Sequence, residues 1–254
     1  MKDAAAQTIY LSEYTPPAFL VDQVQLTFKL GPTNTRVISR IAFRPNPEAN
    51  SDVFFLHGDD LTLISAKIDG QTINPDIDAA GLRCSVPNAP FVFEAEVEIS
   101  PATNTALEGL YMSNGMYCTQ CEAEGFRKIT YYPDRPDVMA VFTVRVEGDL
   151  PVLLSNGNPT SAGDGWAEWH DPWPKPAYLF ALVAGDLVAF SDTFTTQSGR
   201  QVDLNIWVRP GPDEAKSAFG MEALKKSMAW DEKVYGRAYD LDLFNIVAVD
   251  DFNA

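Results

Sequence analysis

At 254 residues the chain is long enough for one large domain, or for one domain and part of another. Hydrophobic residues make up 46% and charged residues 21% of it, which excludes a disordered chain, and no run approaches the ~20 apolar residues that a membrane-spanning helix needs. The formal charge of −16 argues against a nucleic-acid partner and suits a cationic ligand such as a peptide amine, although acidity alone also keeps proteins soluble.

The N-terminal residues 1–7 carry one basic residue and no apolar stretch, so the sequence predicts no signal peptide. Cysteine usage agrees with this. Cys84, Cys118 and Cys121 are too few and too unevenly spaced for a disulfide framework, which favours a reducing compartment. We therefore expect a cytoplasmic protein with no membrane partner.

Short alternations of apolar and polar residues recur over most of the chain, between residues 24 and 190. Residues 24–30 alternate, and residues 91–99 place three glutamates on one face opposite apolar side chains. Asp69–Gly70 separates two apolar runs and predicts a two-residue hairpin turn with positive φ at both positions. Residues 138–146 predict a further strand. This pattern is typical of a β-sandwich or of an open, saddle-shaped antiparallel sheet.

Toward the C-terminus the pattern changes to that of an α/β unit. Residues 201–208 predict one more alternating strand. Gly211–Glu214 predicts a helix start, with proline in the first turn and acidic residues at the positive end of the dipole, and Gly236 is a suitable stop. Residues 245–249 hold a continuous apolar run, as expected of a strand buried on both faces. We place a domain boundary near residues 190–195.

The least regular segment is residues 118–137, which sets many charged side chains among aromatic ones without strand periodicity. A purely structural interpretation is a surface network that pairs Glu124 with Arg127, and Asp134 with Arg135 or Arg127. Such pairs contribute little, roughly 0 to 1 kcal/mol each. Packing alone is therefore a poor explanation for so many charges in one place.

Metal and nucleophile motifs are not found in the sequence. Zinc peptidases of the His-Glu-x-x-His type need two imidazoles on one helix, whereas His57 and His170 lie in unrelated contexts. We expect His57 at the end of a strand and His170 hydrogen-bonded in an aromatic-rich turn. Cys118 and Cys121 form half of a C-x-x-C zinc or redox site, but the second pair is missing, so two semi-buried thiols are the better interpretation.

The segment Cys118-Thr-Gln-Cys-Glu-Ala-Glu-Gly-Phe-Arg127 resembles the substrate-anchoring segment of bacterial aminopeptidase N, a zinc-dependent aminopeptidase family of the gluzincin clan. The resemblance extends from about Tyr14 onward. It includes, in the same order and spacing, residues 99–110, 154–158, 171–186, 192–200 and 246–253.

This resemblance implies a mainly β fold. An N-terminal antiparallel β-saddle or β-sandwich domain would occupy residues 1–192, and residues 193–254 would begin a thermolysin-like catalytic domain. The family continues into a Gly-Ala-Met-Glu-Asn motif and the zinc-binding helix, which would lie beyond Ala254. We therefore expect no metal ligand and no catalytic residue in this chain.

The resemblance also assigns substrate-binding roles. Gln120 and Glu122 match the residues that line the first substrate subsite. An aminopeptidase must hold a protonated amine, which a carboxylate does through a charge-assisted hydrogen bond, and an amide oxygen can accept a second amine proton. Glu124 would share this pocket if the segment is extended, or would pair with Arg127; both are candidates for the pocket wall.

The implied function is the N-terminal portion of a zinc-dependent aminopeptidase that removes N-terminal amino acids from peptides. This part would anchor the substrate α-amine and cap the groove, and would be inactive alone. Its partners would be peptides with a free N-terminal amine and the remainder of the catalytic domain, with zinc held by the full-length parent. Two alternatives stay open: a stand-alone β-sandwich module that binds a peptide or sugar, and a relative with both epoxide hydrolase and aminopeptidase activity.

Overall fold

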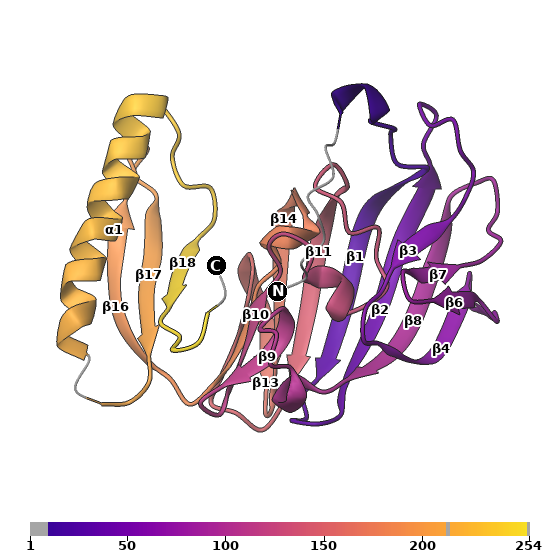
Figure 1. Ribbon diagram of the computed structural model, residues 1–254. Helices are drawn as coiled ribbons and strands as arrows, with labels where there is room; N and C mark the ends of the chain where they lie inside the picture. The colour runs from indigo at the N-terminus through magenta and orange to yellow at the C-terminus, as the bar shows by residue number, and fades with distance from the viewer. Residues whose placement is uncertain (1–9, 212–213, 253–254) are drawn as a thin grey trace.

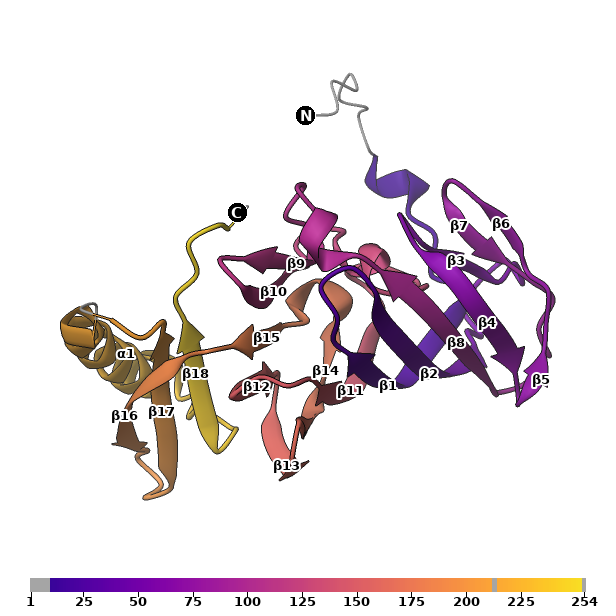
Figure 2. The same cartoon turned by 90° about the horizontal axis from the view of Figure 1, so that it is seen from below.

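The computed structural model describes residues 10–211 and 214–252 and is built mostly of strands, with one long helix near the C-terminus (Figure 1). A large region around an eight-stranded sheet lies beside a smaller region made of a three-stranded sheet and the helix (Figures 1 and 2). Within the described residues, no helix is long and apolar enough to cross a membrane.

The eight-stranded sheet forms the body of the large region, in the order β13-β14-β11-β1-β2-β8-β4-β5. Its strands in that order are Asn158–Gly163, Trp166–Pro176, Met139–Glu147, Phe19–Lys29, Thr35–Pro45, Phe91–Ile99, Thr62–Ile68 and Gln71–Thr72.

The predicted antiparallel arrangement is wrong at one place in this sheet. β1 and β11 pair parallel, with Gln23 beside Val141, whereas the other neighbouring strands are antiparallel. Parallel neighbours need a long crossover between them. Here that crossover contains four strands of the same sheet, β2, β4, β5 and β8, and the whole irregular segment of residues 118–137.

Two small sheets and four short 3₁₀ turns complete the large region. One sheet has the order β12-β15-β10-β9, and the other has the order β3-β7-β6. The strands are Val152–Ser155, Leu182–Gly185, Met116–Gln120 and Gly109–Ser113, then Phe55–His57, Gly81–Arg83 and Asp76–Asp78. The turns are η1 Leu11–Glu13, η2 Pro101–Thr103, η3 Phe126–Lys128 and η4 Ala177–Leu179.

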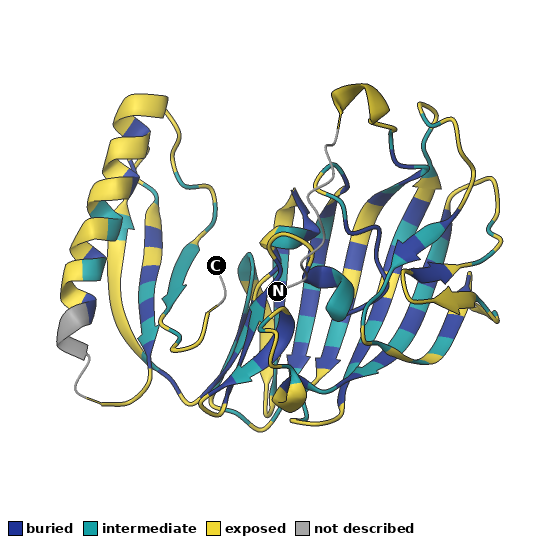
Figure 3. Cartoon of the chain, viewed as in Figure 1, coloured by how far each residue is buried: buried dark blue, intermediate teal, exposed yellow. Residues whose placement is uncertain are grey.

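Local patterns account for much of this architecture. In β8, buried residues alternate with partly exposed glutamates, as the sequence predicts (Figure 3). The hairpin between β4 and β5 turns at Asp69 and Gly70, whose φ angles are 48° and 77°. Only glycine and a few polar residues adopt such angles readily, which confirms the predicted turn.

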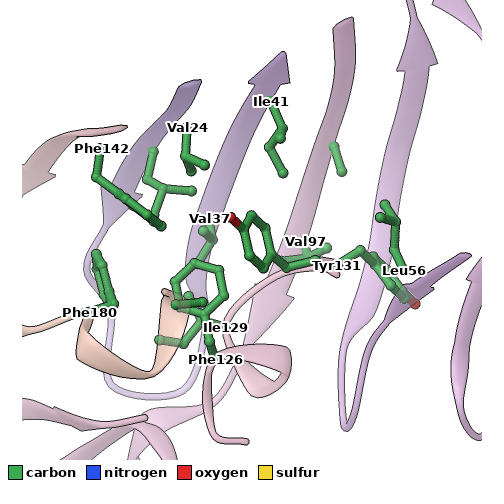
Figure 4. Close-up of a cluster of buried hydrophobic side chains, with 14 of the residues drawn as sticks. Val24, Val37, Ile41, Leu56, Val97, Phe126, Ile129, Tyr131, Phe142 and Phe180 are labelled. Carbon is green, nitrogen blue, oxygen red and sulfur yellow. The ribbon is translucent and has the colours of Figure 1, made fainter. Parts of the chain in front are cut away.

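The core of the large region is aromatic and lies between the eight-stranded sheet and the irregular segment. Phe126 is fully buried, and its ring lies 5.0 Å from that of Tyr132, 5.3 Å from that of Phe180 and 6.0 Å from that of Phe142 (Figure 4). Edge-to-face contacts of this kind add stability beyond the burial of area. The apolar side chains of the irregular segment therefore hold it against the eight-stranded sheet.

The smaller region combines the sheet β16-β17-β18 with helix α1. The strands are Val188–Thr195, Gln201–Val208 and Leu243–Val247, and the helix is Glu214–Tyr235. The predicted helix start falls partly on residues 212–213, which lie outside the described residues. The helix ends where expected, before Gly236, whose φ is 63°.

The strand predicted to be buried on both faces is β18, and all five of its residues are only half-buried (Figure 3). That prediction is wrong because β18 is the edge of the described sheet, whereas α1 packs against β16 and β17. The domain division at residue 192 stays a prediction. It falls within β16, all of which pairs with β17.

Candidate functional site

The candidate site lies where β10 ends and the chain turns back toward η3. β10 pairs with β9 up to Gln120, which is opposite Gly109. Gly125 then returns so close that a Cβ on it would lie 2.3 Å from the carbonyl oxygen of Gln120. Only glycine fits this approach. Residues 121–125 therefore form a compact loop at the end of β10.

Gln120 is the last residue of β10 and Glu122 lies in the loop that follows, and the two differ in exposure. Gln120 is 7% exposed, and its Oε1 accepts the backbone N–H of Glu122 at 3.2 Å. Glu122 is exposed, and no cation among the described residues lies within ion-pair distance of its carboxylate. The peptide bond between Glu122 and Ala123 is cis. The loop thus combines a fixed amide with a carboxylate that faces solvent.

Arg127 occupies the centre of an ion-pair network beside the loop. Its Nη1 lies 3.2 Å from a carboxylate oxygen of Glu124, and its Nε donates to Oδ2 of Asp134 at 3.1 Å. The backbone N–H of Arg127 donates to the same Asp134 oxygen at 3.1 Å. Glu124 does not alternate with Glu122, because residues 122–125 turn instead of extending. Of the two contacts expected for Glu124, the structure shows the one with Arg127.

His57, at the end of β3, supports this network. The backbone N–H of Asp134 donates to Nδ1 of His57 at 3.2 Å, and the His57 backbone pairs with Tyr132. Burial and the nearby charge of Arg127 lower the pKa of His57, whereas burial raises the pKa of Asp134 despite its bonds to Arg127. His57 ends β3, as predicted. Its link to Asp134 has no local signal in the sequence.

A second cation, Lys128, ends η3 beside the loop, and no local pattern in the sequence predicts it as part of the site. Its ammonium lies 2.8 Å from a carboxylate oxygen of Asp59 and 3.7 Å from one of Glu108. The carbonyl of Arg127 also accepts the backbone N–H of Asp59 at 3.0 Å. Both cations that follow the loop are therefore engaged by other carboxylates, which leaves Glu122 without a competing partner.

The described residues do not fit a zinc ion. Among them, no three His, Cys, Asp or Glu side chains are grouped so that they could hold a metal. His170 lies in strand β14 and not in the expected turn, with Nδ1 3.0 Å from the hydroxyl of Thr143. Cys118 and Cys121 are both buried thiols, and burial raises the pKa of Cys118 to about 11. These thiols are more deeply buried than the sequence predicts.

Comparison with known proteins places these features in a family context. A model of the peptidase M1 N-terminal domain matches residues 21–179. Aminopeptidase N of Caulobacter vibrioides is 49% identical over 263 residues, covering 100% of this chain and 30% of its own length. Aminopeptidase N of Escherichia coli is 45% identical over 257 residues, covering 97% of this chain and 29% of its own. The chain thus spans about 30% of the curated relatives that it matches.

Solved structures agree. The crystal structure of Legionella pneumophila aminopeptidase A in complex with aspartic acid superposes with a TM-score of 0.87 at 32% identity, over 95% of this chain and 30% of that one. Native yeast LTA4 hydrolase superposes with a TM-score of 0.75 over 92% of this chain and 38% of that one. At 18% identity, the latter likeness concerns the fold alone.

Proposed function

Because this chain belongs to the peptidase M1 N-terminal domain family, we propose that it is the N-terminal part of a zinc-dependent aminopeptidase, which removes N-terminal amino acids from peptides. We assign residues 1–192 to an N-terminal β-saddle domain and residues 193–254 to the beginning of a thermolysin-like catalytic domain. The coverage of about 30% of the relatives supports a role for this chain as one part of a larger enzyme. Alone, the chain would be inactive.

The role proposed for this part is to anchor the α-amine of the substrate. The observation that carries it is the exposed Glu122 carboxylate, free of ion pairs among the described residues, next to the buried amide of Gln120. The carboxylate would accept a charge-assisted hydrogen bond from the ammonium group. Oε1 of Gln120 accepts the Glu122 N–H, and an amide oxygen at this position would be the second acceptor for the amine.

The ion pairs around the loop support this assignment. Arg127 is shared between Glu124 and Asp134, and Lys128 between Asp59 and Glu108. Neutralised in this way, neither cation competes with a substrate amine for Glu122. Glu124 and Arg127 would form the pocket wall, and they would hold the loop in place rather than contact the amine.

Zinc would be held by the parent enzyme outside this chain and would supply an activated water there. The part of the chain that the structure describes contributes binding and orientation. The partners would be peptides with a free N-terminal amine and the remainder of the catalytic domain. Three free cysteines among the described residues support a reducing compartment, such as the cytoplasm.

Substitution of Glu122 in the full-length enzyme tests the anchoring role. Glu122→Gln removes the charge that pairs with the ammonium, so kcat/KM for aminoacyl anilides should fall. The fall should correspond to a loss of about 2 to 5 kcal/mol of transition-state stabilisation. Glu48→Gln is the matched control, because Glu48 is an exposed carboxylate outside the ion pairs that surround the loop and should change kcat/KM less than about twofold. An unchanged kcat/KM in the Glu122 variant would defeat the assignment.

A further inference from the structure

The hairpin Gly109–Gln120, which consists of β9, its turn and β10, makes functional contacts at both ends. One end carries Gln120 and leads into the candidate amine site. The other end reaches the smaller region and holds its last described residues. None of the contacts at this second end follows from the anchoring role.

Two buried hydroxyls of β9 bind Asp251. The hydroxyl of Tyr111 donates to the Asp251 carbonyl oxygen at 2.7 Å. Oγ of Ser113 donates to the Asp251 carboxylate at 2.7 Å and accepts the Asp251 N–H at 3.3 Å. Tyr111 and Ser113 are 0% and 1% exposed. Asp251 is thus held through its backbone and its side chain.

The turn of the hairpin adds a third contact. The side-chain amide of Asn114 donates to the carboxylate of Asp250, which also accepts from the guanidinium of Arg209. Arg209 follows β17, so Asp250 links the hairpin turn to the end of the central strand of the smaller region. The hydrogen bonds from Arg209 and Asn114 lower the pKa of Asp250.

An apolar contact lies behind these polar ones. Tyr111, Met116 and Cys118 are buried, and Trp207 and Val247 of the smaller region pack against their cluster. A contact with hydrogen bonds at its rim and apolar packing behind resists sliding, since sliding would leave buried polar groups without partners. The hairpin and Asp250–Asp251 therefore form one rigid unit.

The two ends of this unit lie a fixed distance apart. The ladder runs from the pair Met116 and Ser113 to the pair Gln120 and Gly109. At a rise of about 3.3 Å per residue, the four steps of β10 separate the Asp251 contact from Gln120 by about 13 Å. A paired hairpin cannot shorten or lengthen this distance without breaking its ladder.

We propose that the hairpin Gly109–Gln120 is a rigid spacer between the amine site and the proposed catalytic part, residues 193–254. It sets Gln120 and Glu122 at a fixed distance from Asp250–Asp251 of that part. Tyr111 and Ser113 are its positioning residues. This inference rests on the proposed function. An exopeptidase selects the first peptide bond by its distance from the anchored amine. An error of about 1 Å in such a distance can cost about 100-fold in rate.

The test removes the two hydroxyls from the full-length enzyme. Tyr111→Phe combined with Ser113→Ala should lower kcat for aminoacyl anilides about tenfold and change KM less than about twofold, because the amine still binds but the bond to be cut is misplaced. Tyr111→Phe alone, the milder change, should show the same split at smaller size. Ser39→Ala is the matched control, since Ser39 is buried and makes two hydrogen bonds far from the smaller region.

A double-mutant cycle with Glu122→Gln separates this inference from the proposed function. When the amine is no longer anchored, its distance from the reacting bond is no longer set, so the hydroxyl variants should then cost less than about threefold. Equal losses in both backgrounds, or no loss of kcat in the Tyr111 and Ser113 variants, would overturn the spacer while a large Glu122 effect keeps the anchoring role. A silent Glu122→Gln variant would instead overturn the anchoring role.

Hydrogen exchange gives a readout that does not depend on turnover. Loss of the two hydroxyls should speed exchange of the backbone amides at residues 247–251, whereas the amides of the ladder at residues 116–120 should stay protected because the rigid hairpin is undocked but not opened. Ser39→Ala should affect neither segment. Faster exchange at residues 116–120 as well would show that the hairpin yields instead of acting as a spacer, and would overturn the proposal even if activity falls.

Discussion

The large and small regions bury their apolar side chains to different degrees. In the large region the core closes over Phe126, Phe142 and other buried rings (Figure 4). In the small region, α1 leaves Phe219 82% and Trp230 52% exposed, and β18 is half-buried along its length. The large region thus has a complete core of its own. The small region relies on its neighbour for part of its burial.

Contacts at the junction follow from this difference. Trp207 and Val247 of the small region pack on the hairpin of the large one, and Asn158 binds Asp242 through both atoms of its amide. The junction is therefore apolar in the middle and hydrogen-bonded at both ends. It stabilises the small region more than the large one, which the following changes are designed to test.

The largest effect should come from the core of the large region. Phe126→Ala removes a ring that contacts Tyr132, Phe142 and Phe180, and should cost about 3–5 kcal/mol of unfolding free energy. Because contacts with the large region stabilise the small one, backbone amides of both regions should lose protection in hydrogen exchange. Urea unfolding followed by circular dichroism measures the total.

The matched change in the small region is Met221→Ala. Met221 is 1% exposed and packs on β17, so its loss should speed exchange in residues 188–247 and leave β1, β2 and β8 protected. Equal spread of the two effects through the molecule would contradict the asymmetry between the regions.

An intermediate effect should follow from the junction itself. Asn158→Ala removes hydrogen bonds of 3.0 and 2.9 Å to Asp242, and should lower the free energy for local opening of residues 239–247 by about 1 kcal/mol. Hydrogen exchange of these amides measures the change. Thr160→Ala is the control, because its hydroxyl bonds only to Glu168 at the same sheet edge. A comparable opening in both variants would show that the junction contributes nothing.

The smallest effect concerns pH and the large region alone. The folded pKa of His57 is lowered below the ordinary value of 6.5. As the pH falls below about 6.5, the unfolded chain therefore takes up a proton that the folded chain refuses, and stability decreases. His57→Asn keeps an acceptor for the Asp134 N–H and should flatten this loss. Urea midpoints between pH 5 and 8 compare the two proteins, and parallel profiles would refute the idea.

Local sequence patterns predicted where the strands and turns lie better than they predicted which strands pair with one another. The alternation of residues 91–99 and the turn at Asp69 and Gly70 depend on residues adjacent in sequence, and both are found. The parallel pairing of Gln23 with Val141 depends on residues far apart, so no local pattern reveals it. The half-burial of β18 has the same origin, because an apolar run does not specify how much cover its strand receives.

The candidate site shows the same limit at finer scale. The family resemblance singled out Gln120 and Glu122, and the structure places them together at the end of β10 and in the loop that follows, although their roles stay predictions. Alternation was the wrong guide for Glu124, because the close approach of Gly125 to the Gln120 carbonyl turns the chain. The support that His57 gives to Asp134 spans 77 positions and could not be read from either segment.

The parallel pair of β1 and β11 has a consequence for synthesis on the ribosome. β1 lies inside the finished sheet, and its antiparallel partner β2 follows at once, whereas β11 emerges only after the loop of residues 121–125 has been made. Until then one edge of β1 stays open, and an open edge can recruit a strand from another chain. Emergence of β11 closes that edge. The nascent chain is thus open to pairing with a strand of another chain from the synthesis of β1 until β11 emerges, an interval that includes the synthesis of residues 118–137.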